Sequence, residues 1–250
     1  KPCLKLKKAG CPWQRQVFSR IVAKMRPRGK KSMPSFFYFG RILAKVLLVM
    51  LTRWEVRGKE NVPEKGPLVV VCNHLNNADP PILSASLPRE IAFMAKEELF
   101  RNPFTRMIIA GYGAFKVDRK HFDREALRTA GEVLRREVAL GIFPEGSRST
   151  TARLKEALPG SALMALRFNC PVLPVAITGT EKMKGFFWVF RRPRVVITIG
   201  PPFQLPVPSG RTDKKGLINA TDVIMTGIAE LLPESYRGIY GDKTLEQAHA

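Results

Sequence analysis

The stretch of sequence that decides the fold is LVVVCNHLNNADP, residues 68–80. Its first five residues are apolar without alternation, which is typical of a strand buried on both faces of a sheet. A polar segment follows directly, and a helix is expected to open near Pro80 or Pro81. In α/β folds the residues just past the carboxyl end of a strand face the ligand crevice. His74 and Asp79 are therefore predicted to lie at the edge of a binding site.

The spacing of His74 and Asp79 suits a base and the carboxylate that orients it. Five residues span a turn and the start of a helix, which brings Asp79 back toward the imidazole. A carboxylate on one ring nitrogen fixes the tautomer, so that the other nitrogen can take a proton from a hydroxyl. Neither Ser147 nor Cys72 has the context of a nucleophile elbow. A His near an Asp, taken alone, more often has a structural role. If the pair is catalytic, it indicates a base that acts on an external alcohol.

Apolar runs and helical patterns alternate along the rest of the chain and predict an α/β fold. The expected sheet is mixed and largely parallel, and helices flank it. Strands are expected at residues 54–57, 67–72, 91–95, 113–117, 140–143, 172–177 and 194–199. Helices are expected at about residues 98–110, 123–138, 159–168 and 213–231.

Two segments of this region have no clear element. Residues 184–194, KGFFWVFRRPR, mix aromatic side chains with arginines. This composition favours a membrane-dipping loop and the end of a hairpin about equally. The tail, residues 233–250, is expected to be a loosely packed end without visible chemistry.

The charge of the chain is concentrated at its N-terminal end. The formal net charge is +21, which implies an anionic partner such as phospholipid headgroups, nucleic acid or phosphorylated small molecules. Residues 1–31 hold eleven Lys or Arg and no acid. Within them, residues 13–25 have apolar side chains at helical spacing and cations off that stripe, which predicts a basic amphipathic helix.

A second, more apolar helix is expected at residues 36–52. Seventeen residues span roughly 26 Å, a little less than the ~30 Å hydrocarbon core of a bilayer. Arg41 and Lys45 share one narrow face, and their cations favour a helix that lies in the interface and reaches lipid phosphates. A true span and packing on the protein's own core are the alternatives. Residues 1–52 are thus predicted to be membrane-binding helices, and residues 53–250 an α/β domain.

The four cysteines, Cys3, Cys11, Cys72 and Cys170, form no C-x-x-C pair. They support neither a zinc site nor a disulfide framework, so a reducing compartment and no metal are expected. No cleavable signal peptide is recognisable, because no small-residue cleavage site follows an apolar run at the start.

A second polar motif, FPEGSRS at residues 143–149, also follows an apolar strand. Arg148 suits bidentate recognition of a phosphate. Glu145 is expected either to bind a glycerol hydroxyl or to hold Arg148 in place. Alone, the motif fits an ordinary turn with a surface ion pair. A third segment, GAFKVDR at residues 113–119, ends in Arg119, a second phosphate candidate.

Together these segments resemble the motifs of the lysophosphatidic acid acyltransferases, a family of glycerolipid acyltransferases. The family carries N-H-x-x-x-x-D, a G-x-x-F-x-x-R-like block, F-P-E-G-T/S-R and a V-P-V-A-like strand. The same order occurs here at residues 73–79, 113–119, 143–148 and 172–177. The resemblance covers roughly residues 53–200, and the combination of four blocks is highly specific.

The resemblance implies transfer of a fatty acyl group from acyl-CoA or acyl-carrier protein to the free sn-2 hydroxyl of lysophosphatidic acid, giving phosphatidic acid. It implies His74 as base and Asp79 as its orienting carboxylate. It implies that the acceptor is bound by Lys96, Arg119, Glu145, Gly146, Ser147 and Arg148. No cofactor is needed beyond the acyl thioester co-substrate. The expected location is a membrane surface, at the cytoplasmic face of the bacterial inner membrane.

Two departures from the family pattern bear on acceptor choice. Ser147 stands where the family often has Thr, and the region after Arg148 matches the usual Gly-containing block only loosely, through Pro159-Gly160. An acyltransferase acting on glycerol-3-phosphate or another lysolipid is therefore an alternative. From another class, a non-enzymatic basic protein that binds membranes or nucleic acid is also compatible with the charge. The cations lie beside apolar helical faces and no nucleic-acid module is recognisable, so no nucleic acid partner is expected.

Overall fold

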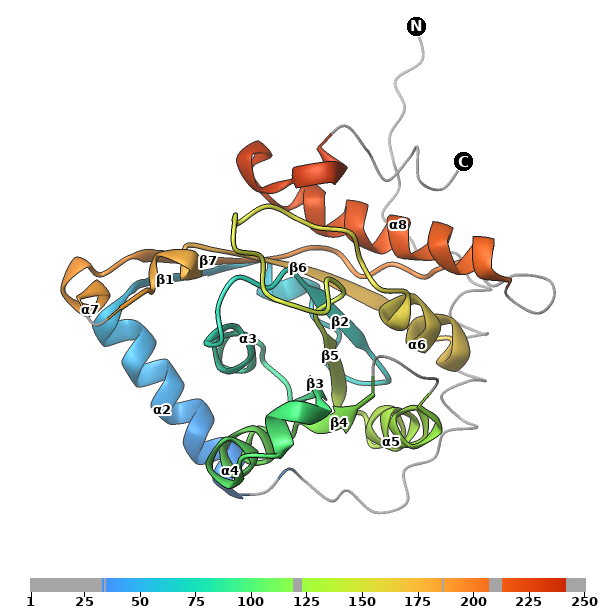
Figure 1. Ribbon diagram of the computed structural model, residues 1–250, viewed down its shortest axis with the longest axis horizontal. Helices are drawn as coiled ribbons and strands as arrows, with labels where there is room; N and C mark the ends of the chain where they lie inside the picture. The colour runs from blue at the N-terminus through green and yellow to red at the C-terminus, as the bar shows by residue number, and fades with distance from the viewer. Residues whose placement is uncertain (1–32, 34, 119–122, 186, 207–212, 242–250) are drawn as a thin grey trace, which may run out of the picture.

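The computed structural model of the protein describes residue 33 and residues 35–118, 123–185, 187–206 and 213–241. Its centre is a seven-stranded sheet with the strand order β1-β7-β6-β2-β5-β3-β4 (Figure 1). All seven strands lie where the sequence predicts them, with small shifts at their ends. Their bounds are β1 (Arg53–Arg57), β2 (Val69–Cys72), β3 (Ile91–Lys96), β4 (Phe115–Val117), β5 (Ala139–Ile142), β6 (Val172–Thr178) and β7 (Arg194–Ile199).

The strand directions confirm a mixed, largely parallel sheet. Strands β6, β2, β5, β3 and β4 run in the same direction. Strand β7 pairs antiparallel with β6, and β1 pairs parallel with β7, so these two run the other way. Because β2 and β5 are parallel neighbours, the loops that follow them start at the same edge of the sheet.

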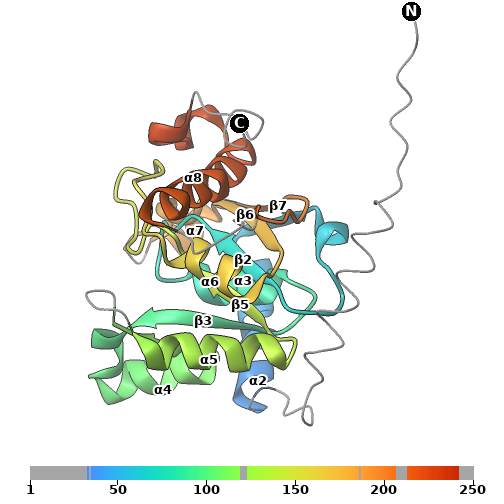
Figure 2. The same cartoon turned by 90° about the vertical axis from the view of Figure 1, so that its right-hand side faces the viewer.

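Helices cover both faces of this sheet (Figures 1 and 2). Helices α5, α6 and α8 pack on one face, and α2 and α3 pack on the other. The longer helices are α2 (Ser35–Leu51), α3 (Asp79–Ser86), α4 (Pro103–Gly111), α5 (Arg124–Arg135), α6 (Gly160–Phe168) and α8 (Lys214–Glu230). Shorter turns of helix are α7 (Trp188–Arg191), η1 (Lys59–Asn61), η2 (Glu97–Phe100), η3 (Thr180–Lys182), η4 (Glu234–Tyr236) and η5 (Gly238–Tyr240).

Strand β2 shows why its sequence is apolar without alternation. Val69 and Val71 belong to the core under α5, α6 and α8, whereas Val70 and Cys72 belong to the core under α3. All four residues are fully buried. Burial on both faces removes the period-two pattern that a half-exposed strand would show.

Helix α2 confirms the predicted apolar helix at residues 36–52. It packs on α3 and β1 through one face that includes Phe37 and Leu48, and it leaves most of its other apolar side chains exposed. Arg41 lies in the packed face, where its guanidinium donates to the carbonyl of Leu87 at the end of α3. The expectation that Arg41 reaches outward to lipid phosphates is therefore wrong, because this cation fixes the helix to the domain.

None of the helices in the described part of the chain combines the length and the apolar character needed to cross a bilayer. The basic helix predicted at residues 13–25 lies outside the described residues. The division of the chain between residues 52 and 53 stays a prediction.

The two segments left open by the sequence now have defined positions. Residues 184–185 and 187–193 lie in the connection between the antiparallel strands β6 and β7, which confirms the end of a hairpin. Membrane dipping of this segment stays a prediction. The expectation of a loosely packed tail is wrong for residues 233–240. Tyr240 is buried, and the hydroxyl of Tyr236 donates to Glu181 Oε1 at 2.9 Å. Residues 242–250 lie outside the described part.

Candidate active site

His74 and Asp79 lie together just past the carboxyl end of β2, as the motif spacing predicts. The distance from His74 Nδ1 to Asp79 Oδ2 is 2.8 Å. Asp79 is the first residue of α3 and has no solvent exposure, whereas the His74 side chain is 16% exposed. Asp79 therefore holds the imidazole from inside the protein, and part of the ring remains accessible from outside. When Nδ1 donates to the carboxylate, Nε2 is the nitrogen that accepts a proton.

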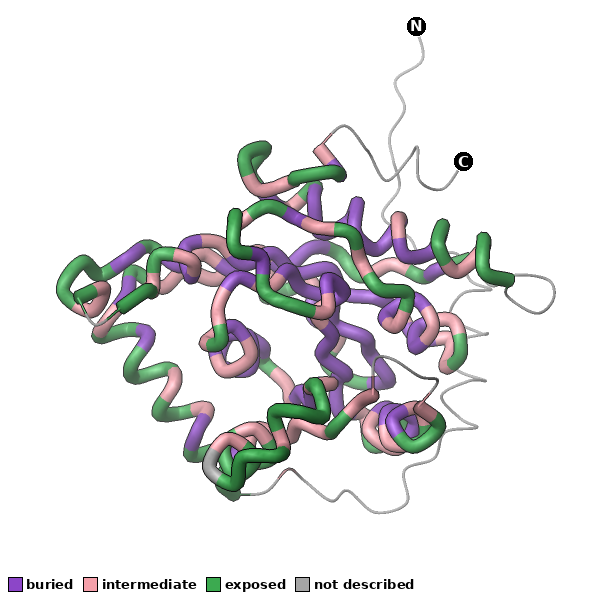
Figure 3. Tube along the Cα trace, in the orientation of Figure 1, coloured by how far each residue is buried: buried purple, intermediate pink, exposed green. Residues whose placement is uncertain are grey.

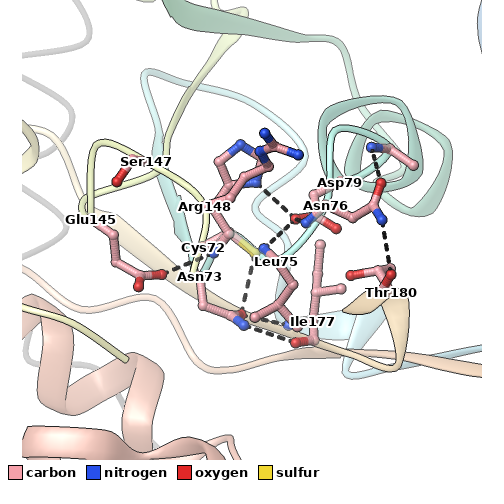
Figure 4. Close-up of polar contacts among 12 residues, drawn as sticks. Cys72, Asn73, Leu75, Asn76, Asp79, Glu145, Ser147, Arg148, Ile177 and Thr180 are labelled. Carbon is pink, nitrogen blue, oxygen red and sulfur yellow. Dashed lines mark hydrogen bonds and ion pairs between the residues drawn. The ribbon is translucent and has the colours of Figure 1, made fainter. Parts of the chain in front are cut away.

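The carboxylate of Asp79 also shapes the loop that carries His74. Its Oδ2 accepts the backbone N–H of Leu75 at 2.6 Å and that of Asn76 at 2.7 Å. These bonds fold the loop around the carboxylate (Figure 4). Asp79 therefore orients the imidazole from a position that the backbone itself fixes. Its position at the N-terminal end of α3 adds the favourable interaction of an anion with the helix dipole.

Two asparagines fasten this loop to β6 and to the turn that follows β6, and the sequence alone assigned neither a role. The side chain of Asn73 accepts the N–H of Ile177 at 2.7 Å and donates to its carbonyl at 2.9 Å. Asn76 donates to the carbonyls of Thr180 and Met183 at 3.1 and 3.2 Å. Asn73 thereby continues the pairing of β2 with β6 beyond the last residue of β2 (Figure 4). The sequence feature that could have indicated these contacts is the presence of a side-chain amide before and after His74, at Asn73 and Asn76.

An aromatic side chain supports the imidazole from the side of β5. The rings of His74 and Phe143 stack with centroids 4.2 Å apart and an angle of 26°. Phe93 lies next in the row, 6.0 Å from Phe143. A Cβ on Gly141 would come within 2.7 Å of the Phe93 ring, so the glycine makes room for this row. Stacking restricts the rotation of a side chain that must present one nitrogen in a fixed direction.

Glu145 binds the protein rather than projecting into the crevice. It is 6% exposed, its Oε1 accepts the N–H of His74 at 3.0 Å, and its Oε2 accepts the N–H of Lys155 at 3.2 Å. Burial raises the pKa of the Glu145 carboxyl, even though both hydrogen bonds act to lower it. The two roles expected for Glu145 were to bind a hydroxyl and to hold Arg148. The contacts instead show a carboxylate that fixes two backbone segments.

The rest of this motif forms a surface loop above Glu145. Gly146 has φ of +68°, a left-handed conformation that favours glycine. Ser147 and Arg148 are exposed. Lys155 Nζ donates to the Ser147 hydroxyl at 2.7 Å and to the carbonyls of Ser147 and Arg148, both at 3.2 Å. Lys155, which sequence reasoning did not single out, therefore fixes the backbone that carries Arg148.

The other two cations predicted to bind the acceptor are Lys96 and Arg119. Among the described residues, no observed contact links Lys96 to His74 or Asp79. Lys96 ends β3, which is separated from β2 by β5, and its Nζ lies 2.9 Å from Glu98 Oε1. Both partners are about half exposed, so the pair contributes little to stability. Arg119 lies outside the described residues.

An apolar cavity of about 230 Å³ adjoins the stacked rings. It lies between the end of β5 and helices α5 and α6. Its apolar lining includes Met94, Ile142, Phe143, Pro144, Leu158 and Met164. A second cavity of about 260 Å³ lies between α2 and α3 and reaches Ala78, the neighbour of Asp79. Both have the mostly apolar lining that is typical of sites for apolar ligands.

The thiol nearest the site does not provide a nucleophile. Cys72 is fully buried at the end of β2, and burial raises the pKa of its thiol well above the ordinary value of 9.0. The negative charges of Asp79 and Glu145 act in the same direction. A neutral thiol is a poor nucleophile. In the described part of the chain, no three His, Cys, Asp or Glu side chains are grouped as metal ligands would be.

Comparison with known proteins shows which family has this arrangement. The acyltransferase family matches residues 53–178, which include both polar motifs. The chain belongs to the acyltransferase family. This acyltransferase is 30% identical over 189 residues to the 1-acyl-sn-glycerol-3-phosphate acyltransferase of Bacillus subtilis (strain 168), an alignment that covers 75% of this chain and 92% of the relative. It is 32% identical over 128 residues to that of Borreliella burgdorferi, covering 50% of this chain and 51% of the relative.

A solved structure gives the same result. The acyltransferase is similar to the crystal structure of the 1-acyl-sn-glycerophosphate (LPA) acyltransferase PlsC from Thermotoga maritima, with a TM-score of 0.57 and 26% sequence identity. The match covers 90% of this chain and 84% of the other. The family resemblance that the motifs predict and the α/β fold are therefore confirmed.

Proposed function

We propose that this acyltransferase transfers a fatty acyl group from an acyl thioester to the sn-2 hydroxyl of lysophosphatidic acid, giving phosphatidic acid. The observation that carries the proposal is the 2.8 Å contact between His74 Nδ1 and the buried Asp79 carboxylate. The relatives from Bacillus subtilis and Thermotoga maritima are named for acyl transfer to the same acceptor, which supports the proposal. No metal or cofactor takes part in the proposed chemistry.

In this proposal His74 is the base. Its Nε2 removes the proton of the acceptor hydroxyl while the oxygen attacks the thioester carbonyl carbon. Asp79 keeps the ring in the required tautomer and stabilises the imidazolium that forms. The tetrahedral intermediate then collapses, the carbon–sulfur bond breaks, and the imidazolium returns the proton to the leaving sulfur. The products are the ester and a free thiol. Because the attacking oxygen belongs to the substrate, the protein needs no nucleophile of its own.

The phosphate of the acceptor is proposed to bind the loop at residues 143–148. Arg148 is exposed there, and the backbone of this loop is fixed to His74 by Glu145 and Ser149. A guanidinium forms bidentate hydrogen bonds with phosphate, which positions the glycerol as well as holding it. Arg119 and Lys96 are proposed as further cations for the same phosphate. Gly146 and Ser147 contribute the turn and a hydroxyl.

The acyl chain of the thioester is proposed to enter the 230 Å³ cavity beside Phe143. This cavity adjoins the ring that stacks on His74, so a chain placed in it would bring its carbonyl end near the imidazole. Its lining is mostly apolar, and burial of hydrocarbon there is favourable by about 0.8 kcal/mol per methylene.

The proposed site of action is an anionic membrane surface on its cytoplasmic side. Helix α2 exposes large apolar side chains along its outer face, and the net charge of +21 suits anionic headgroups. A helix of this kind lies in the interface and brings the site to a lipid that is scarcely free in water. The exposed residues of α2 include Phe39, Ile42, Val46, Val49 and Met50.

Release of free thiol tests the proposal directly. The full chain is incubated with oleoyl-CoA or oleoyl-carrier protein and, in turn, with lysophosphatidic acid, glycerol-3-phosphate or lysolipids with other headgroups. The proposal expects thiol release that depends on lysophosphatidic acid and produces phosphatidic acid. Release that is faster with glycerol-3-phosphate would reassign the acceptor. No acyl transfer to any acceptor from either donor would contradict the enzymatic proposal.

A further inference from the structure

A second apolar surface lies beside α2, on the connection between β6 and β7. Phe187 and Phe190 are 72% and 76% exposed, more than any apolar residue of α2. They lie on and just before the single turn of α7, one turn apart, so both side chains contribute to one small surface. Large exposed aromatic side chains that gather in this way mark interaction sites rather than ordinary surface.

Cations surround these two rings and no acid interrupts them. Lys184, Arg191 and Arg192 are all exposed, and residues 184–194 contain no Asp or Glu. Apolar rings flanked by Lys and Arg are the composition that suits the boundary between headgroups and acyl chains of an anionic bilayer. A second copy of the chain would bring the same cations face to face, which like-charge repulsion disfavours.

The structure places this surface next to the outer face of α2. The Arg192 guanidinium donates to the carbonyl of Val49 at 3.2 Å, near the C-terminal end of α2. Trp188 lines the same cavity as Leu47 and Leu51 of that helix. Figures 1 and 3 show α7 at the end of α2, and Figure 3 shows exposed residues on both elements. The exposed apolar residues of the two elements are therefore neighbours on the surface.

We infer that α7 and the residues that flank it, 187–192, form a second contact with an anionic phospholipid surface, in addition to α2. This inference extends the membrane attachment proposed for α2 and rests on it. The second contact widens the membrane-facing surface at the C-terminal end of α2, which restricts how far the domain can roll about the axis of that helix. The cavity between α2 and α3 is lined by residues of α2, by Trp188 of α7 and by Ala78, so both proposed contacts lie beside that cavity.

Vesicle binding of matched variants tests the contact. The full chain with Phe187→Ser and Phe190→Ser is compared with a control carrying Ile218→Ser and Ile239→Ser, which removes two exposed apolar side chains from other elements. The vesicles contain phosphatidylcholine alone or with phosphatidylglycerol. Loss of two inserted rings should lower the partition coefficient for the anionic vesicles about ten-fold or more. The control should change it little. An equal effect of both pairs, or no effect of the phenylalanine pair, would overturn the inference.

A depth measurement separates insertion from indirect effects. A nitroxide is attached at Phe190→Cys or at the control Ile218→Cys, in a chain with Cys3→Ser and Cys11→Ser, where Cys72 and Cys170 are buried. On anionic vesicles the label at position 190 should become accessible to oxygen and protected from a water-soluble nickel complex. The label at position 218 should stay exposed to nickel. A label at position 190 that stays aqueous on bound protein, or a dimer in solution that the phenylalanine pair dissociates, would overturn the inference.

Turnover distinguishes failure of this inference from failure of the proposed reaction. With lysophosphatidic acid dispersed in detergent, the phenylalanine variant should release thiol at the wild-type rate, because neither ring contacts the catalytic pair. On anionic vesicles its rate should fall with its binding. If the wild-type chain binds vesicles through residue 190 yet releases no thiol, the proposed reaction fails and the membrane contact stands. If turnover on vesicles is unchanged and binding is unchanged, the membrane contact fails and the reaction stands.

Discussion

The carboxylate of Glu145 accepts the backbone N–H of His74 at 3.0 Å, which joins the two polar motifs of the chain. The backbone carbonyl of His74 in turn accepts the N–H of Ser149 at 2.7 Å. Both backbone polar groups of His74 are therefore bound by the loop that follows β5. The base and the loop that carries Arg148 form one unit, so changes in either loop should affect the other.

Replacement of Glu145 by Gln should destabilise the fold. Each carboxylate oxygen accepts a backbone N–H, and a Gln side chain would present its amide donor to one of them. One buried N–H left without an acceptor costs about 1–3 kcal/mol. Denaturant unfolding of Glu145→Gln measures the loss, and Glu64→Gln, at an exposed position, is the matched control. Equal stability of the two variants would show that the Glu145 bonds do not stabilise the fold.

The stability contributed by Glu145 should depend on pH in a defined direction. Burial raises the pKa of its carboxyl above the ordinary value of 4.5. A group with a raised pKa in the folded state contributes most below its unfolded pKa, and this contribution is lost as the pH rises through the folded pKa. The difference in unfolding free energy between wild type and Glu145→Gln should thus shrink as the pH rises above the ordinary pKa of 4.5. A difference that grows over this range would contradict the cause assigned to the shift.

Removal of the Lys155 ammonium should impair acceptor binding more than turnover. The Lys155 ammonium donates to the backbone carbonyls of Ser147 and Arg148 and to the Ser147 hydroxyl. It makes no observed hydrogen bond to the imidazole of His74. For Lys155→Met we expect the KM for lysophosphatidic acid to rise about ten-fold, roughly the effect of losing 1.4 kcal/mol of positioning. The KM for the thioester should change little. Partial recovery in Lys155→Arg is expected, and equal changes in both KM values would count against a positioning role.

Cys72 should be dispensable for the chemistry. Its thiol is buried and its raised pKa keeps it neutral, so no acyl-cysteine intermediate is expected. Cys72→Ala should cost about 1 kcal/mol of stability through lost packing and retain most of the turnover. Cys170→Ala is the matched control, because Cys170 is as deeply buried but lies just before the start of the neighbouring strand β6. A large loss of turnover in Cys72→Ala alone, with the protein folded, would point to a covalent intermediate.

The fold was predictable from the sequence where burial of an element determines its pattern of apolar residues. Strand β2 is apolar at every position because it is covered on both faces, and its end positions His74 and Asp79. The α2 helix could be predicted from its composition. Its docking could not, because nothing in the sequence shows that Arg41 finds a carbonyl at the end of α3.

The contacts of the site were less predictable for the same reason. Glu145 looks like a surface carboxylate within its motif, and only the fold shows that the end of β2 covers it. Lys155 lies outside the motif it fixes, and its role depends on how the chain returns after Arg148. Spacing within a motif predicts which residues of one loop meet, whereas contacts between loops depend on the sheet order.

The central claim is that His74 is the base, and turnover of His74→Ala tests it most directly. Thiol release with saturating oleoyl thioester and lysophosphatidic acid is compared among wild type, His74→Ala and Asn77→Ala, an exposed residue of the same loop. His74→Ala should lower kcat at least about a hundred-fold, the scale of general-base loss, while Asn77→Ala stays close to wild type. Near-normal kcat in folded His74→Ala would contradict the account.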